Sequence, residues 1–137
     1  KKHLEPECRL DLARKLVKKI GISSMIDVSD GVASEVRHIC ELSDVGASIY
    51  ADKIPISKDT IIDSKKLGKS AIDFALYGGE DFELVFTAGK SKLKQLKKYD
   101  AAVIGEIVGK EYGIKLIKNG KKLNLESGFD HFKRIRV

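Results

Sequence analysis

The chain has 137 residues, 42% of them hydrophobic and 34% charged, which is typical of a folded globular protein and excludes a disordered one. No apolar run approaches the roughly 20 residues that a membrane helix needs, so we expect no membrane partner. The formal net charge is +6, from 26 basic and 20 acidic side chains.

Much of the basic charge comes as lysine pairs, at residues 18–19, 65–66, 97–98 and 121–122. One interpretation is a cationic surface that binds nucleic acid. The other is ordinary solvated surface. We favour the second, because the pairs are scattered and no aromatic residues alternate with them to stack on bases. We therefore expect no nucleic-acid partner.

The two cysteines, Cys8 and Cys40, belong to no CxxC motif and have no companions at zinc-site spacing. The helical pattern that follows residue 31 places Cys40 on an apolar face, which predicts a small core residue. Two cysteines give no disulfide framework, so we expect an intracellular, cytoplasmic protein.

Hydrophobic spacing and turn residues predict the elements in chain order. Helices are predicted at residues 11–20, 31–42, 57–68 (capped by Ser57 or Asp59), 71–77 and 91–96. Strands are predicted at residues 22–28, 46–51, 82–87 and 102–108, with a hairpin of 112–117 and 122–125 across an Asn-Gly turn. Helices and strands alternate irregularly and the last strands are adjacent, which predicts an α/β (α+β) fold with a mixed sheet covered by helices.

The motif MIDVSDG at residues 25–31 predicts the end of a buried strand, a polar turn and a helix start. Such a junction attracts anions to the helix amides, and Asp27 and Asp30 are residues that hold Mg²⁺ against phosphate oxygens. The alternative is that Ser29 or Asp30 simply caps the helix. That leaves Asp27 unexplained beside apolar neighbours, where an unpaired carboxylate is costly.

Two other stretches carry candidate functional residues. Gly78-Gly79 followed by Glu80 is either a helix end with an acidic turn or a loop whose backbone approaches a ligand while Glu80 binds it. In the GFDHF stretch at residues 128–132, Phe129 either covers a core edge or stacks on a heteroaromatic ligand.

Three motifs in this order, MIDVSDG at 25–31, YGGEDFEL at 77–84 and GFDHF at 128–132, resemble the C-terminal half of the thiamine-monophosphate kinase family. The opening HLEP at residues 3–6, followed by Arg9 and Leu10, is similar to the entry into that family's second domain. The resemblance covers essentially the whole chain. In looser form the first motif also resembles other members of the aminoimidazole ribonucleotide synthetase superfamily.

The resemblance implies three layers, with helices flanking a mixed sheet, and ATP- and Mg²⁺-dependent phosphorylation of thiamine monophosphate to thiamine diphosphate. Carried over position by position, it implies that Asp27 and Asp30 ligate Mg²⁺ and that Ser29 contacts ATP phosphate. It also implies that Glu80 contacts the thiamine substrate and that Phe129 lines or stacks on it. No protein nucleophile is implied, because in-line phosphoryl transfer needs positioning and charge neutralisation.

In this family an N-terminal domain supplies most metal-binding aspartates, much of the nucleotide pocket and the main dimer contact. We therefore interpret residues 1–137 as the single C-terminal domain of a two-domain, homodimeric kinase whose N-terminal domain is absent from this sequence, which begins with Lys1 rather than Met. We expect the chain alone to have no appreciable kinase activity. The alternatives are another ATP-dependent enzyme of the superfamily and a non-catalytic basic binding module.

Overall fold

The structure, a computed structural model, describes residues 7–125. Within that range the strands are β1 (Ser24–Asp27), β2 (Gly46–Tyr50), β3 (Leu84–Thr87), β4 (Gly105–Val108), β5 (Ile114–Lys118) and β6 (Lys121–Asn124). The α-helices are α1 (Leu10–Lys15), α2 (Val32–Ser43), α3 (Lys58–Lys66), α4 (Ala71–Tyr77) and α5 (Leu93–Leu96). Short helical turns are η1 (Leu16–Ile20), η2 (Ala51–Lys53), η3 (Lys90–Lys92), η4 (Lys97–Tyr99) and η5 (Lys110–Tyr112).

The strands form two separate sheets. β1 and β3 pair antiparallel as a ribbon, and the other four form a sheet in the order β4-β2-β5-β6. Within that sheet β2 and β5 are parallel while the other neighbours are antiparallel, which confirms the mixed α/β prediction. Helix α2 contacts β1 of the ribbon and β2 of the larger sheet, so it packs against both sheets.

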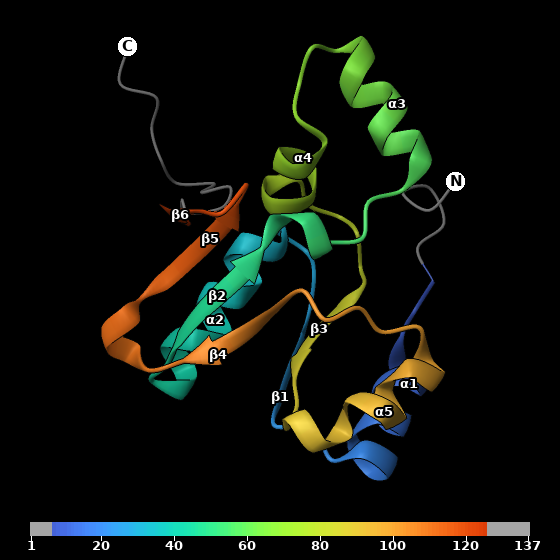
Figure 1. The fold of residues 1–137 in the computed structure, drawn as a ribbon. Helices are drawn as coiled ribbons and strands as arrows, with labels where there is room; N and C mark the ends of the chain where they lie inside the picture. The colour runs from blue at the N-terminus through green and yellow to red at the C-terminus, as the bar shows by residue number, and fades with distance from the viewer. Residues whose placement is uncertain (1–6, 126–137) are drawn as a thin grey trace.

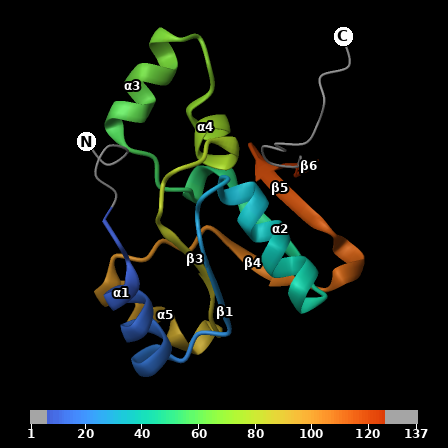
Figure 2. The ribbon, with the colours of Figure 1, turned by 180° about the vertical axis from the view of Figure 1, so that it is seen from behind.

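Helix α2 covers one face of the four-stranded sheet, behind it in Figure 1 and in front of it in Figure 2. Its apolar side builds the main core with Val28, Leu76 and side chains of β2 and β5. Figures 1 and 2 also show α1 and α5 on the side of the ribbon away from α2. There Leu16, Ile20 and Leu96 form a second core.

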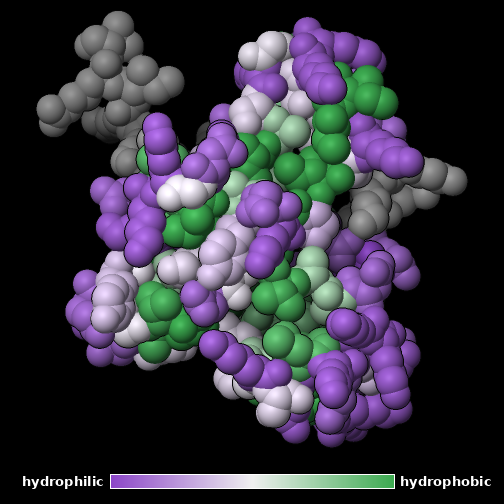
Figure 3. All heavy atoms as spheres, viewed as in Figure 1, coloured by the Kyte–Doolittle hydropathy of each residue, from purple (hydrophilic) through white to green (hydrophobic). Residues whose placement is uncertain are grey.

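The register of the four-stranded sheet places Ser48, Tyr50, Glu106 and Lys115 on the face opposite α2. This face carries polar side chains, and the Tyr50 hydroxyl donates to Glu106 Oε1 at 2.8 Å. Figure 3, which looks onto this side of the molecule, shows green apolar patches separated by purple and white side chains. The sheet is therefore polar only in part on the face opposite α2.

Several element ends depend on single residues. The Ser57 hydroxyl accepts the Thr60 amide hydrogen at 3.1 Å, so Ser57, not Asp59, caps α3. Asn119 and Gly120 have φ of 51° and 72°, the left-handed pair that a type I′ hairpin turn requires. β3 begins two residues later than predicted, because Phe82 has a φ of 51° that breaks extended backbone.

The C-terminal hairpin also begins later than predicted, because Tyr112 lies in a helical turn and β5 begins at Ile114 after Gly113, whose φ is 64°. The strand predicted from residue 102 begins at Gly105. Across residues 7–125, none of the helices combines the length and apolar character needed to cross a membrane.

Candidate functional site

The MIDVSDG motif forms the predicted strand–turn–helix junction between β1 and α2. Val28 is buried in the main core, and Gly31 begins the helix with a φ of 97°. A Cβ built on Gly31 would lie 2.6 Å from the Leu76 carbonyl oxygen. Both the φ and the close approach require glycine, so Gly31 fixes where the turn meets α4.

Neither Ser29 nor Asp30 caps α2 through its side chain, because the cap position is held by Gly31, which has no side chain. Glu35 reaches back over the helix start instead. Its Oε1 accepts from the Asp30 amide at 3.2 Å and lies 3.4 Å from the Ser29 hydroxyl. Glu35 was not among the site residues predicted from the sequence; an acidic residue one turn into a helix that starts with glycine was the available signal.

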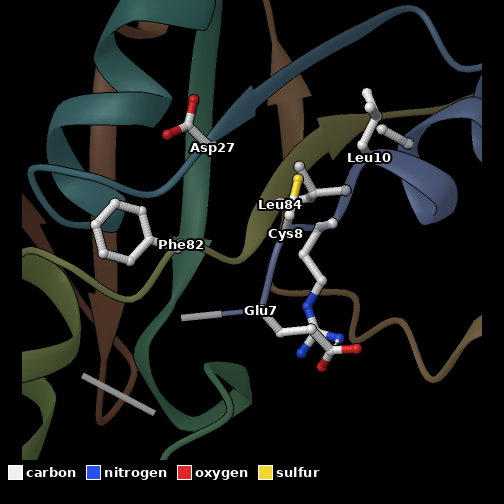
Figure 4. Close-up of a pocket in the computed structure, with 8 residues that line it drawn as sticks. Glu7, Cys8, Leu10, Asp27, Phe82 and Leu84 are labelled. Carbon is white, nitrogen blue, oxygen red and sulfur yellow. Dashed lines mark hydrogen bonds and ion pairs between the residues drawn. The ribbon is translucent and has the colours of Figure 1, made fainter. Parts of the chain in front are cut away.

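Asp27 lies on the strand side of the turn and is exposed. The expectation that apolar neighbours would bury its carboxylate was therefore wrong, because the side chain faces solvent at the end of β1 rather than a core. Asp27 lines a cavity of about 420 Å³, whose lining comes from Glu7, Cys8, Arg9, Leu10, Ala13, Asp27, Phe82 and Leu84. Figure 4 shows the Asp27 carboxylate and the Phe82 ring on one side of this cavity and Leu10 on the other.

The Gly-Gly-Glu-Asp loop lies directly against the Asp-Val-Ser-Asp turn. The Glu80 amide donates to the Ser29 carbonyl at 2.8 Å, and the Phe82 amide donates to the Val28 carbonyl at 2.9 Å. Glu80 and Phe82 both have positive φ, of 68° and 51°, which is uncommon for residues with side chains. Strained backbone of this kind concentrates at ligand sites.

An ion pair fixes the far end of this loop. Arg9 binds Glu83 through two hydrogen bonds, Nε to Oε2 at 3.1 Å and Nη2 to Oε1 at 2.8 Å. The hydrogen bond to Glu83 and its charge raise the pKa of Arg9 above its usual value. The pair therefore connects the segment before α1 to the loop that carries Glu80.

Phe129 lies outside the described residues, as does the rest of the GFDHF stretch. The last described residue, Leu125, offers its carbonyl to Arg37 of α2 at 3.0 Å. The structure thus brings together Asp27, Ser29, Asp30 and Glu80 around one turn, and it leaves Phe129 untested.

Asp27 and Asp30 are the two carboxylates that this turn offers to a cation. Across the described range, no group of three or more His, Cys, Asp or Glu side chains is placed to hold a metal. However, the Asp27 and Asp30 carboxylates make no hydrogen bond or ion pair with any described residue. Mg²⁺ in phosphoryl-transfer sites is held by one or two carboxylates together with phosphate oxygens and water. The residues present fit a cation shared with a bound phosphate.

The fold and the turn define an α/β domain that presents carboxylates and a glycine-rich loop beside a helix start. This chain belongs to the family described as AIR synthase related protein, C-terminal domain, whose model matches residues 2–117. The residues matched include the MIDVSDG and YGGEDFEL motifs and end before residue 129.

Curated relatives carry the name thiamine-monophosphate kinase. The protein from Aquifex aeolicus (strain VF5) is 33% identical over 131 residues, which cover 96% of this chain and 40% of the relative. The protein from Buchnera aphidicola subsp. Acyrthosiphon pisum (strain APS) is 40% identical over 139 residues, covering 96% of this chain and 42% of the relative. The chain therefore spans about two fifths of the length of the curated relatives it matches.

Solved structures share the fold. The structure of AaThiL complexed with AMPPCP and TMP superimposes with a TM-score of 0.79 at 32% identity, over 96% of this chain and 40% of that one. E. coli HypE, a hydrogenase maturation protein, gives a TM-score of 0.70 at 22% identity over 88% of this chain and 41% of that one, which shows the common fold alone.

Proposed function

We propose that this chain is the C-terminal domain of a kinase that transfers the γ-phosphoryl group of ATP to thiamine monophosphate, giving thiamine diphosphate. The observation that carries the proposal is the hydrogen-bonded contact between the two motifs, in which the Glu80 amide binds the Ser29 carbonyl. One turn would then present the proposed phosphate-binding and acceptor-binding residues together. The named relatives and the AMPPCP and TMP complex of a similar structure support this assignment.

On the phosphate side, Asp27 and Asp30 are the proposed magnesium ligands. The exposed Asp27 and the unpaired Asp30 carboxylate leave room for a cation that also contacts phosphate. When bound, Mg²⁺ would neutralise phosphate charge and orient the reacting groups for in-line transfer. Ser29 is the proposed contact to an ATP phosphate, for which its hydroxyl hydrogen must turn away from Glu35.

On the acceptor side, Glu80 is the proposed ligand of the thiamine group. Its side chain is exposed at the end of the glycine-rich loop, and its backbone is held by Ser29. A carboxylate suits a cationic thiazolium ring. Phe129 is proposed to stack on the acceptor, since an aromatic face suits a heteroaromatic ring.

The remaining parts of the site belong to a second domain in this proposal. Two carboxylates make an incomplete magnesium site, and the relatives are more than twice as long as this chain. We propose that an N-terminal domain supplies the other half of the ATP and metal site and that the complete enzyme is a homodimer. A kinase that consumes ATP would work in the cytoplasm, where ATP is made and free thiols such as those of Cys8 and Cys40 persist.

The test uses the proposed two-domain enzyme and measures thiamine diphosphate formed from ATP and thiamine monophosphate. Asp27→Asn should raise the Mg²⁺ concentration needed for half-maximal turnover, whereas Asp59→Asn on α3 should not change it. Glu80→Gln should raise the KM for thiamine monophosphate and leave that for ATP unchanged. The 137-residue chain alone should show no appreciable turnover.

Two results would contradict the proposal. If the wild-type enzyme phosphorylates another acceptor and not thiamine monophosphate, the substrate assignment is wrong. If the Asp27→Asn variant needs the same Mg²⁺ concentration for half-maximal turnover as the wild type, the metal role of Asp27 is wrong.

A further inference from the structure

Glu35 is a buried carboxylate directly behind the phosphate side of the candidate site. Its side chain is 2% exposed, and only Glu35 and Ser64 are buried polar residues in the described range. Oε1 accepts the Asp30 amide hydrogen and the Ser29 hydroxyl hydrogen, at 3.2 and 3.4 Å. Oε2 lies 3.3 Å from Nδ1 of His38, one turn further along α2.

Burying a carboxylate is costly unless hydrogen bonds compensate it. A residue whose only task was to fill this space would be apolar, as the neighbouring Val32, Ala33 and Val36 are. Glu35 instead uses both oxygens on polar partners, and two of those partners belong to the motif. The buried Glu35 carboxylate therefore holds Ser29 and Asp30 in their positions in the turn.

A helix start has amide hydrogens without intrahelical partners, and Ser, Asp or Asn side chains usually bind them. Here the chain has Ser29 and Asp30 next to the helix start, so both are natural capping residues. Gly31, which has no side chain, takes the cap position, while Glu35 binds the amide of Asp30, the residue before the cap. This hydrogen bond holds Asp30 outside the helix, and the Asp30 carboxylate makes no hydrogen bond or ion pair with the described residues.

We propose that Glu35 is a positioning residue that keeps the Asp30 carboxylate and the Ser29 hydroxyl from capping α2, so that both remain available to Mg²⁺ and phosphate. This inference rests on the proposed function. Glu35 itself does not contact substrate or metal. The Ser29 contact of 3.4 Å is long for a hydroxyl bond, so the hydroxyl can turn to a phosphate at little cost.

The Asp30 amide gives a readout that needs no activity. In the 137-residue chain, nuclear magnetic resonance follows amide hydrogen exchange at residue 30 in the absence of metal. Glu35→Ala should speed exchange of the Asp30 amide by about tenfold or more, because it loses its acceptor. Glu35→Asp is one methylene too short to reach and should have a similar effect, whereas Glu41→Gln on the exposed side of the same helix should have none.

The same variants in the proposed two-domain enzyme test the positioning role. Glu35→Asp should raise half-saturating Mg²⁺ by about 10- to 100-fold, the range seen when groups behind metal ligands are removed. The KM for thiamine monophosphate should stay unchanged, and so should the circular dichroism spectrum. Glu35→Gln keeps an oxygen for the Asp30 amide and should rescue most of the loss.

The outcomes separate the two hypotheses. If the wild-type enzyme does not phosphorylate thiamine monophosphate, the proposed function fails, and the Asp30 exchange rate still decides what Glu35 does. If the enzyme is active but Glu35→Asp and Glu35→Ala leave Asp30 exchange and the Mg²⁺ requirement unchanged, the positioning role is overturned. An equal increase in the KM values for all ligands would likewise overturn the positioning role, since that pattern indicates a general loss of structure.

Discussion

The amide of Glu80 donates a hydrogen bond to the carbonyl of Ser29 at 2.8 Å, and this contact joins two motifs that lie far apart in the sequence. Gly79, next to Glu80, makes the contact possible. A Cβ built on Gly79 would lie 2.4 Å from the same Ser29 carbonyl oxygen. The loop at residues 78–81 and the turn at residues 27–30 are thus in direct backbone contact and form one unit.

Gly79→Ala should therefore separate the two loops. We expect a loss of about 1–3 kcal/mol in the free energy of unfolding, the cost of forcing an extra methyl group into a packed contact. Urea unfolding measures it, with Gly89→Ala as the control, because a Cβ on Gly89 meets only Ser91 Oγ at 3.8 Å. Equal stability of the two variants would show that the loops can move apart freely.

The Arg9–Glu83 pair should contribute modestly to stability. The side chains are 26% and 41% exposed, so solvent screens them, and a double-mutant cycle with Arg9→Met and Glu83→Gln should give a coupling of about 0.5–1 kcal/mol. Arg9→Lys should lose part of it, because lysine cannot make the paired hydrogen bonds.

The pH dependence of this pair has a definite sign. The pKa of Arg9 is raised in the folded state, so the stabilisation is complete below the unfolded pKa and is lost only at more alkaline pH. The coupling should therefore be constant between pH 7 and 10. A coupling that disappeared within that window would contradict the assignment of Arg9 as the cation.

The two cysteines should differ sharply in reactivity. Cys8 is exposed and Cys40 is buried in the main core. A thiol reagent should modify Cys8 quickly in the folded chain and Cys40 only on unfolding. If both cysteines reacted quickly with the reagent in the folded chain, the packing of α2 against β2 would be contradicted.

Burial raises the pKa of Cys40 above its ordinary value of 9.0. The unfolded thiol then ionises first as the pH rises, so the stability contributed by the neutral thiol is lost from about pH 9 through the folded pKa. Urea unfolding at pH 7 and pH 10, compared with the same measurements on Cys40→Ala, gives the part of the pH dependence of the free energy of unfolding that comes from Cys40. A smaller pH slope is expected for the variant; identical slopes would contradict the prediction.

The phenol of Tyr50 should ionise at a higher pH than an ordinary tyrosine. Its hydroxyl donates to Glu106 Oε1, and this bond raises the pKa of Tyr50 above 10.0. Glu106→Gln removes the charge and should lower it, which ¹³C-labelled tyrosine resonances would follow. Glu111→Gln, nearby on the chain but not bonded to Tyr50, is the control, and an unchanged Tyr50 titration in Glu106→Gln would refute the contact.

The sequence predicted local structure well where one residue or one pattern decides it. The strand–turn–helix at residues 25–31 and the Asn119–Gly120 turn were predicted and are confirmed, and of the two predicted caps for α3, Ser57 and Asp59, the structure has Ser57. Each depends on neighbours in the chain, so spacing and turn chemistry were sufficient.

Tertiary contacts set the features that sequence patterns did not reveal. The division of the strands into two sheets depends on pairing between strands that are distant in the sequence, which no local pattern encodes. The late start of β3 follows from Phe82, whose backbone is held by Val28. Glu35 lies at helical spacing from Val32 and Ile39 on the apolar side of α2, but only the fold shows that its carboxylate is buried and which groups it binds.

The geometry around the candidate residues could not be predicted from the sequence. The backbone contact between Ser29 and Glu80 depends on the fold, and Asp27 is exposed, contrary to what its apolar neighbours suggested. The ligand roles of Asp27, Ser29, Asp30 and Glu80 stay predictions, as does that of Phe129.

The ribbon of β1 and β3 carries one motif at the end of its first strand and the other just before its second. A two-stranded ribbon is marginal on its own, and this one is supported on one face through Val85 and on the other through Met25 and Phe86. Residues such as Leu16 and Leu96, which contact no proposed ligand, therefore help to decide whether the motifs meet. Substitutions there would weaken the contact between the two motifs while leaving every motif letter intact, and a comparison of the motifs alone would not detect them.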